Sequence, residues 1–312
     1  MSPRPAHSPS VWGRMRPLVV GLPFGWLLFF FALPFVILLR ISITDMGEQL
    51  DPFASLLRTV NGQLGVFVQV QSFISLLRSS EGGWFDTLYL DSYALSLRYA
   101  FLTTALCLLV GYPFAYFLAR TRPAYRALLL LMVMLPFWTS FLLRVYAWKM
   151  LLADNGVFNN MAMLAGLLDE PLKMMNTPFS LVLGMVYTYL PFMILPLYAN
   201  LVKMDLRLLE AALDLGATPW QAFWRITVPL SKSGIIAGAL LVFIPCVGEF
   251  VIPELLGGPQ TLMIGRVLWD EFFSNNDWPM AASVAVVMVL LIIVPIAFFN
   301  KYQAENSGGA RA

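Results

Sequence analysis

The chain has 312 residues, of which 59% are hydrophobic and 12% charged, and its mean hydropathy is +0.74. This composition excludes a water-soluble globular domain, in which about 25% of residues are charged. A single histidine and two cysteines, Cys107 and Cys246, exclude a His-based catalytic or metal centre and give no support for a disulfide framework. We therefore expect an integral membrane protein with no metal site, in which both cysteines are small packing residues.

Six apolar segments are long enough to cross a bilayer, which takes about 20 residues of α-helix. They lie at 18–41, 93–118, 127–151, 179–202, 235–256 and 280–300. The first follows Arg14 and Arg16 and so resembles a signal peptide, but its apolar run is too long and no small-residue cleavage site follows. We predict that it is retained, in an all-α fold with six transmembrane helices.

The distribution of Lys and Arg predicts the orientation, because short cytoplasmic loops carry an excess of these residues. The segments 44–91, 153–178 and 257–279 hold few of them and many acids, so we place these segments outside and both termini in the cytoplasm. Twelve of the 20 Lys and Arg residues lie on the other side: Arg4, Arg14, Arg16, Arg120, Arg122, Arg126, Lys203, Arg207, Arg225, Lys232, Lys301 and Arg311.

The segment 44–91 contains a partly alternating run, GVFVQVQSF. Alternation favours a strand pair, whereas an interfacial helix fits the same residues. Both alternatives stay open, and we expect the segment to fold as a cap on the helix bundle.

The loop 203–234 contains strong local signals for a helix, a sharp turn and a second helix. Gly216 stands where a left-handed residue ends a helix at low steric cost. Thr218 and Pro219 are a natural N-cap and first helical residue, and Gln221 completes a capping box. The first helix is predicted from apolar residues three or four positions apart: Met204, Leu206, Leu209, Ala212 and Leu213.

A plain connection needs only a few residues, so a loop of this length predicts a rigid projection. Part of its apolar surface is expected to pack under the bundle. The remainder, including Trp220, Phe223 and Trp224, either fills a groove of a partner or lies on the membrane surface.

The same loop carries a resemblance to a known family. Glu210-Ala211-Ala212, three residues, Gly216, nine residues and Ile226-Thr-Val-Pro229 resemble the EAA motif of binding-protein-dependent ABC importer permeases. The one departure is Val228 in place of leucine. The runs LPFWTSFLLRVYAW, IIAGALLVFIPCVGEFVIPELLGGP and MIGRVLW are similar to the polyamine branch of these permeases, and to its putrescine-type members above all. The similarity covers most of residues 18–300.

The resemblance implies a type I ABC importer permease core in a bacterial inner membrane. It divides the chain into a cytoplasmic tail (1–17), a first transmembrane helix (18–43), a periplasmic segment (44–91), a permease core (92–300) with the coupling loop 203–234, and a second tail (301–312). It also implies a heterodimer with a second permease, an ATPase dimer, a periplasmic binding protein and a polyamine substrate, and it gives no role to nucleic acid.

The resemblance further implies that the loop enters a cleft of the ATPase. Gly216 would shape the bend, Glu210 would make polar contacts, and Ala211 and Ala212 would permit close approach, with Ile226 and Pro229 completing the motif. The chain has no phosphate-binding G-x-x-x-x-G-K-[ST] run. ATP and Mg are therefore expected on the separate ATPase, with no cofactor and no enzymatic activity in this chain.

Two acids in the fifth segment, Glu249 and Glu254, are candidates for a substrate path, because ionisable residues inside a membrane usually face a polar interior. Nearby prolines and Gly248 predict a broken helix there. A polyamine also needs aromatic faces for its ammonium ends, and the candidates are Trp138, Tyr146, Tyr187 and Tyr189.

In the alternative interpretation the two acids pair with Arg144 or Lys149 and hold helices together, while the aromatic residues pack or anchor the chain. A permease for another small cation or solute also stays open, as does a secondary transporter that moves a proton through Glu249. An intramembrane enzyme is disfavoured because neither HExxH nor G-x-S-x-G is present. The residues do not distinguish putrescine from spermidine.

Overall fold

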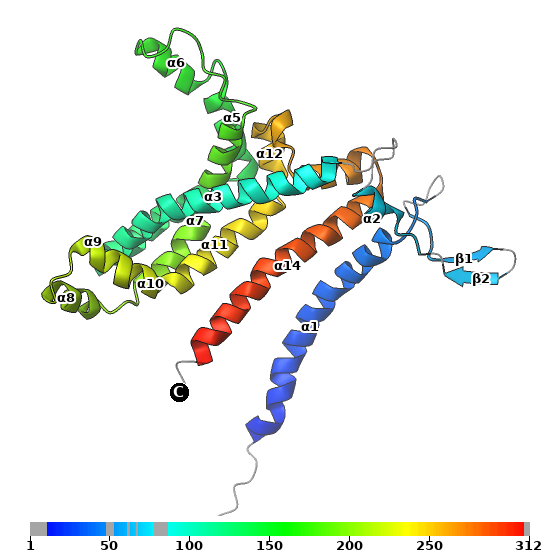
Figure 1. Cartoon of the computed structure of the whole chain (residues 1–312), viewed down its shortest axis with the longest axis horizontal. Helices are drawn as coiled ribbons and strands as arrows, with labels where there is room; N and C mark the ends of the chain where they lie inside the picture. The colour runs from blue at the N-terminus through cyan, green and yellow to red at the C-terminus, as the bar shows by residue number, and fades with distance from the viewer. Residues whose placement is uncertain (1–10, 48–52, 61–62, 67, 78–86, 309–312) are drawn as a thin grey trace, which may run out of the picture. The chain divides into compact units, whose positions relative to one another are not determined.

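The computed structural model describes residues 11–47, 53–60, 63–66, 68–77 and 87–308. The chain divides into a smaller unit, Met1–Ile74 with Asn276–Val286, and a larger unit, Ser75–Asn275 with Val287–Ala312. Figure 1 traces both units, which are described separately below.

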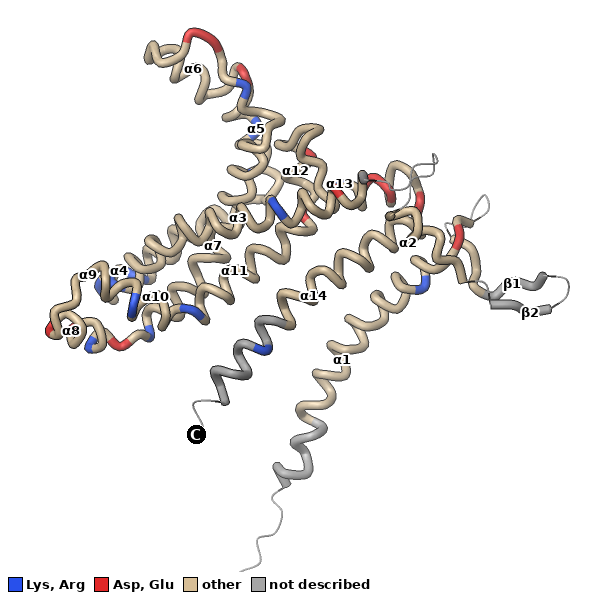
Figure 2. The backbone as a smooth tube through the Cα atoms, viewed as in Figure 1, with Lys and Arg blue, Asp and Glu red and all other residues tan. Residues whose placement is uncertain are grey.

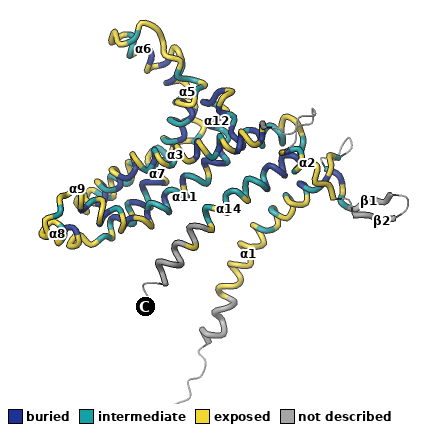
Figure 3. Tube along the Cα trace, viewed as in Figure 1, coloured by how far each residue is buried: buried dark blue, intermediate teal, exposed yellow. Residues whose placement is uncertain are grey.

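Three long helices form the core of the larger unit: α3 (Thr87–Arg120), α7 (Pro178–Leu201) and α11 (Lys232–Val247). Buried residues concentrate where these helices face one another, as Figure 3 shows. Cys107 and Cys246 are fully buried among them and unpaired, which confirms their predicted packing role. A Cβ on Gly238 would lie 2.8 Å from Met193 Sδ, so α11 approaches α7 through a small residue, as membrane helices do.

Two of the predicted spans are broken rather than continuous. In place of one helix at 127–151, α4 (Pro123–Met134) and the 3₁₀ turn η1 (Leu135–Trp138) are followed by α5 (Phe141–Leu152) and α6 (Val157–Leu164). The two halves meet at 85°. Pro136 has no backbone N–H to donate and Thr139 is extended, which interrupts the helical hydrogen-bond ladder.

The predicted helix at 235–256 is likewise divided, into α11 and α12 (Val251–Leu256), and its break falls in the predicted Gly248 region. Among the described residues, four helices are long and apolar enough to cross a membrane. The number is six if two bent pairs, Pro123–Trp138 with Phe141–Leu164 and Pro219–Leu230 with Lys232–Val247, each count as one span. The remaining elements of this unit are α8 (Arg207–Asp214), α9 (Pro219–Ala222), the π-helix η2 (Phe223–Thr227), α10 (Val228–Leu230), η3 (Pro259–Thr261), α13 (Ile264–Trp269) and the π-helix η4 (Asp270–Ser274).

The smaller unit holds α1 (Val11–Ser42), a hairpin and the start of α14 (Trp278–Gly308). Strand β1 (Leu57–Val60) pairs antiparallel with β2 (Gln63–Val66), and α2 (Gln71–Ser75) follows. The run GVFVQVQSF was predicted as a strand pair or a helix, and it contributes to both elements, because it begins in β2 and ends in α2. The Ser283 hydroxyl donates to the Ser42 carbonyl at 3.2 Å, which ties α14 to the end of α1.

Several helices extend past the predicted boundaries. α3 begins at Thr87, inside the predicted segment 44–91, and α14 continues to Gly308, through much of the predicted tail 301–312. Helical hydrogen bonding does not stop at the edge of an apolar run, and the residues beyond it include good helix formers such as Gln, Ala and Glu.

Charge is distributed unevenly in the larger unit. Figure 2 shows Lys and Arg gathered around α4, α9 and α10, near the end of α3. Arg126 donates from Nε to the Thr121 carbonyl and from Nη2 to the Ala119 carbonyl, both at 2.8 Å. A cation thereby satisfies the free carbonyls at the C-terminal end of α3.

Candidate functional site

The predicted helix, turn and second helix of the loop 203–234 are confirmed. α8 ends before Gly216, whose φ is +84°, and α9 begins after Thr218. The Thr218 hydroxyl accepts a hydrogen bond from the Gln221 backbone N–H at 3.3 Å, and the Gln221 side chain accepts one from the Thr218 backbone N–H at 3.0 Å. This reciprocal capping box fixes the direction in which α9 leaves the bend.

The residues of the EAA-like motif differ in solvent exposure along the loop. Glu210 and Ala211 are exposed on α8, Ala212 is half-buried, and Leu209 is the buried residue of this helix. Pro229 is exposed and Ile226 half-buried beyond the bend. The first part of the motif thus forms an accessible polar surface with small side chains, while the last part runs back toward the bundle.

The loop is attached to the bundle by a contact that sequence reasoning did not identify. The Phe223 ring lies edge-on against Tyr112 at 5.6 Å and Tyr116 at 5.9 Å, measured between ring centroids. The hydroxyls of Tyr112 and Ser231 are 2.8 Å apart, and both residues are buried. Packed side chains of Phe223 and Ser231 thus connect the loop to α3, in addition to the backbone.

The three aromatic residues of the loop separate into two groups. Phe223 packs on Tyr112 and Tyr116 of α3, so its predicted place on the outward-facing part of the loop is wrong. Trp220 and Trp224 keep 69% and 52% of their surface exposed and contact each other at 5.6 Å between centroids. The two tryptophans form an outward-facing apolar pair beside the bend.

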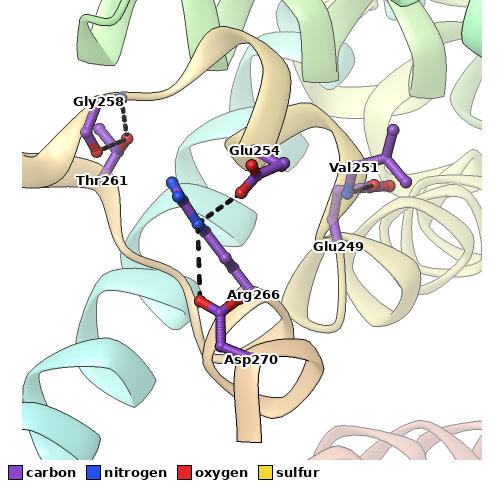
Figure 4. Close-up of polar contacts among 7 residues, drawn as sticks. All are labelled: Glu249, Val251, Glu254, Gly258, Thr261, Arg266 and Asp270. Atoms are coloured by element: carbon purple, nitrogen blue, oxygen red, sulfur yellow. Dashed lines mark hydrogen bonds and ion pairs between the residues drawn. The ribbon is translucent and has the colours of Figure 1, made fainter. Parts of the chain in front are cut away.

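A second feature lies at the break between α11 and α12, where Glu249 is buried with 9% of its surface exposed. Its Oε1 accepts hydrogen bonds from the backbone N–H of Val251 at 3.0 Å and of Ile252 at 3.4 Å, and Figure 4 shows its place beside Val251. Its Oε2 accepts from the Tyr189 hydroxyl of α7. The carboxylate thereby caps the start of α12 and attaches it to the central helix.

Close packing of α13 also maintains this break. A Cβ on Gly265 would lie 2.5 Å from the carbonyl oxygen of Gly248 and 2.6 Å from that of Glu249. Only a glycine allows α13 to approach the interrupted backbone so closely.

Next to the break, one cation lies between two carboxylates. Arg266 Nε is 2.6 Å from Glu254 Oε2 and 4.0 Å from Asp270 Oδ2, and Figure 4 shows the guanidinium between the two acids. Two aromatic rings lie near these charges: Trp269 stacks on Phe250, with 4.5 Å between ring centroids and 9° between ring planes. The sequence did not identify Arg266, Asp270 or Trp269, although Arg266 and Asp270 have the i, i+4 spacing of a helical ion pair.

Arg144 and Lys149, the two cations of the alternative interpretation, do not pair with Glu249 or Glu254. Arg144 stacks over Phe137 at 4.8 Å and Phe141 at 5.9 Å. Among the described residues, neither Arg144 nor Lys149 has a carboxylate within 4.0 Å. The predicted pairing of Glu249 or Glu254 with these two cations is therefore wrong, because each acid has a nearer partner in the structure.

The predicted aromatic residues do not form one group with the acids. Tyr189 hydrogen-bonds to Glu249. Tyr187, also on α7, lies edge-on against Trp148 at 5.4 Å. Trp138 of η1 and Tyr146 of α5 are 76% and 50% exposed, so both offer open aromatic faces.

The chain is similar to a described family of transport proteins and to several characterised members. Residues 108–304 match the family described as binding-protein-dependent transport system inner membrane component. The spermidine/putrescine transport system permease protein PotB of Haemophilus influenzae is 38% identical over 294 residues, which cover 94% of this chain and 95% of that protein. PotB of Escherichia coli is 37% identical over 268 residues, covering 86% and 90%.

Two further likenesses extend the comparison. The molybdenum transport system permease protein ModB of Azotobacter vinelandii is 34% identical over 225 residues, covering 70% of this chain and 97% of that protein. Among solved structures, a bacterial ABC transporter involved in the import of the acidic polysaccharide alginate superposes with a TM-score of 0.65 at 18% identity, covering 94% and 97%. These findings confirm the predicted helical permease fold, to which the structure adds a short hairpin.

Proposed function

Because the chain belongs to the family of binding-protein-dependent transport system inner membrane components, we propose that it is the permease subunit of an ATP-driven importer for a polyamine. It is a multi-pass inner membrane transport component and not an enzyme. The observation that carries the substrate class is the likeness to two spermidine/putrescine permeases over nearly the whole chain. Both termini would lie in the cytoplasm, in agreement with the Lys and Arg distribution.

The cluster beside the break has the chemistry that a polyamine requires. Glu254 and Asp270 supply two carboxylates, and Arg266 neutralises only one of them, so the group carries a net charge of −1. An ammonium end of the substrate would compete with the guanidinium for these acids, and Trp269 would offer a face for cation–π contact. Trp138 and Tyr146 remain candidates further along the path.

Glu249 has a different role in this proposal. Both of its oxygens already accept hydrogen bonds within the chain, from two backbone N–H groups and from Tyr189. We assign it to shaping the path by holding the break open, with Tyr187 and Tyr189 as part of the wall. Glu254, whose side chain is 51% exposed, would contact the substrate directly.

The loop between α7 and α11 would couple this chain to the ATPase. Exposed Glu210 and Ala211, the Gly216 bend and the neighbouring Ala212 would enter the ATPase cleft, and Ile226 and Pro229 would return the chain to the bundle. ATP and Mg would be bound by the ATPase dimer. A second permease would complete a heterodimer, and a periplasmic binding protein would deliver the polyamine.

Another solute is the competing proposal, since the chain also resembles a molybdenum permease. The net negative cluster around Glu254 disfavours an anion such as molybdate and favours a cation. Proton-coupled secondary transport through Glu249 has less support, because the Gly216 bend and its capping box would then have no role. Putrescine and spermidine share the same ammonium chemistry, and we name putrescine first only because of the resemblance to putrescine-type permeases described above.

The test is uptake of labelled putrescine by cells without their own polyamine importers, supplied with the binding protein, the ATPase and the second permease. Uptake that requires this chain and is competed by excess spermidine supports the proposal. Glu254→Gln should reduce it, whereas Glu170→Gln, an exposed acid in the segment 153–178, should not. An assembled complex that hydrolyses ATP without moving either polyamine would overturn the substrate assignment.

A further inference from the structure

A groove of about 630 Å³ runs along α3 and α7 on a surface that the proposed transport mechanism does not use. Its lining residues recur at every third or fourth position, so one stripe of each helix faces it. The apolar part includes Leu102, Leu106 and Val110 of α3 and Val182 and Val186 of α7. The volume lies within the range of about 300–1,000 Å³ that small-molecule sites occupy.

The position of the groove along α3 matches one leaflet of a bilayer. No charged residue occurs between Arg98 and Arg120, which are 22 positions apart, or about 33 Å along an α-helix. This length agrees with a hydrocarbon thickness of about 30 Å. The groove lining begins at Leu95, and its part within the uncharged stretch runs from Arg98 to Val110, about 18 Å or roughly half of that thickness. It therefore lies in the leaflet away from the loop 203–234.

The polar end of the groove carries a cation, Arg98. Arg98 and Gln260 line this end with a guanidinium and an amide, and both are exposed. Among the residues that the structure describes, no carboxylate lies within 4.0 Å of Arg98. At the edge of the hydrocarbon region the abundant anions are lipid phosphates, and a guanidinium matches a phosphate with paired hydrogen bonds.

We propose that this groove is a phospholipid site. One acyl chain lies along Leu102, Leu106 and Val110, the phosphate pairs with the Arg98 guanidinium, and the Gln260 amide donates to the headgroup oxygens. In the orientation proposed above, this is the outer leaflet. The other possible occupant is an apolar helix of the second permease, which would fill the same stripe but would leave Arg98 without a phosphate.

The experiment uses the purified complex in vesicles of phosphatidylethanolamine and phosphatidylglycerol that carry a photoactivatable diazirine in the acyl chain. After illumination, labelled peptides are quantified by mass spectrometry. We expect labelling at 102–110 and 182–186. Arg98→Gln should lower it about five-fold or more, and Leu106→Trp, which fills the groove, should lower it at least as far.

Leu109→Trp is the matched control, because Leu109 is on the same helix at the same depth, is exposed and does not line the groove. Labelling that is unchanged in both Arg98→Gln and Leu106→Trp would overturn the proposal. A high-yield crosslink from Leu106→Cys to the second permease would also overturn it, since protein would then cover the groove. Neither readout depends on transport, so a wrong substrate assignment would not affect the result.

Discussion

The bend at Gly216 gives the sharpest prediction about coupling. Its φ is +84°, and a Cβ placed there would meet no atom within 4 Å. Substitution is therefore penalised by backbone conformation alone. The left-handed region costs an L-residue roughly 1–2 kcal/mol, which lowers the population of the bent loop by about 5- to 30-fold. Asparagine tolerates this region better than alanine, and a β-branched residue tolerates it least.

We expect transport to fall least in Gly216→Asn, further in Gly216→Ala and most in Gly216→Val, while the complex still assembles. The assay measures ATP hydrolysis and labelled putrescine uptake in proteoliposomes, with assembly followed by gel filtration. Gly166→Val is the matched control, because Gly166 also has positive φ (+67°) and open space around it but lies outside the loop. Equal loss with asparagine and valine would refute the conformational argument and indicate that side-chain bulk at the ATPase contact is responsible.

Three further changes test other contacts. Ser231→Ala leaves the Tyr112 hydroxyl without its partner and should cost about 1–3 kcal/mol, measured as a lower Tm of the complex in detergent and weaker coupling of hydrolysis to uptake. Gly238→Leu forces a side chain into the space occupied by Met193 Sδ, which lies 2.8 Å from the Cβ position. It should lower the Tm by the equivalent of about 1–3 kcal/mol. An unchanged Tm would show that α7 and α11 separate easily. Glu254→Gln should raise the KM for polyamine. Adding Arg266→Gln should partly reverse this increase, since no guanidinium then competes with the substrate for Asp270. A double variant with a still higher KM would contradict the idea that the ammonium ion takes the place of the guanidinium.

The loop 203–234 was predictable because its signals are local. Thr218 and Gln221 are three residues apart, and the positive φ of Gly216 depends on the turn that glycine itself begins. Interactions of this range are specified by residue type and spacing alone. No knowledge of the surrounding fold was needed to place them.

The breaks in the spans were predictable only in part. Hydropathy counts apolar residues and ignores whether the backbone can complete its ladder, so 127–151 was predicted as one helix in spite of Pro136. At 248–250 the nearby Gly248 and Pro253 did indicate a break. Length and apolar character therefore identify a membrane-crossing segment, whereas proline and glycine decide whether it is straight.

The identity of ion-pair partners was beyond the sequence for a physical reason. Glu254 pairs with Arg266 twelve positions later, and Glu249 receives the hydroxyl of Tyr189 from sixty positions earlier. The pairing with Arg144 or Lys149 assumed a straight helix over 127–151, but this segment bends by 85°. Depth along a straight helix is a poor guide to proximity where helices are broken.

The two acids beside the break also show why the cost of a charge inside a membrane does not by itself assign function. That cost requires each carboxylate to find donors, but it is met in different ways. Glu249 receives two backbone N–H groups and a tyrosine hydroxyl, so its acceptors are filled by the fold. Glu254 is half exposed and has the Arg266 guanidinium as its partner. Because an ammonium ion can replace a guanidinium but not a helix N-terminus, we propose Glu254 as the acid that a cationic substrate contacts.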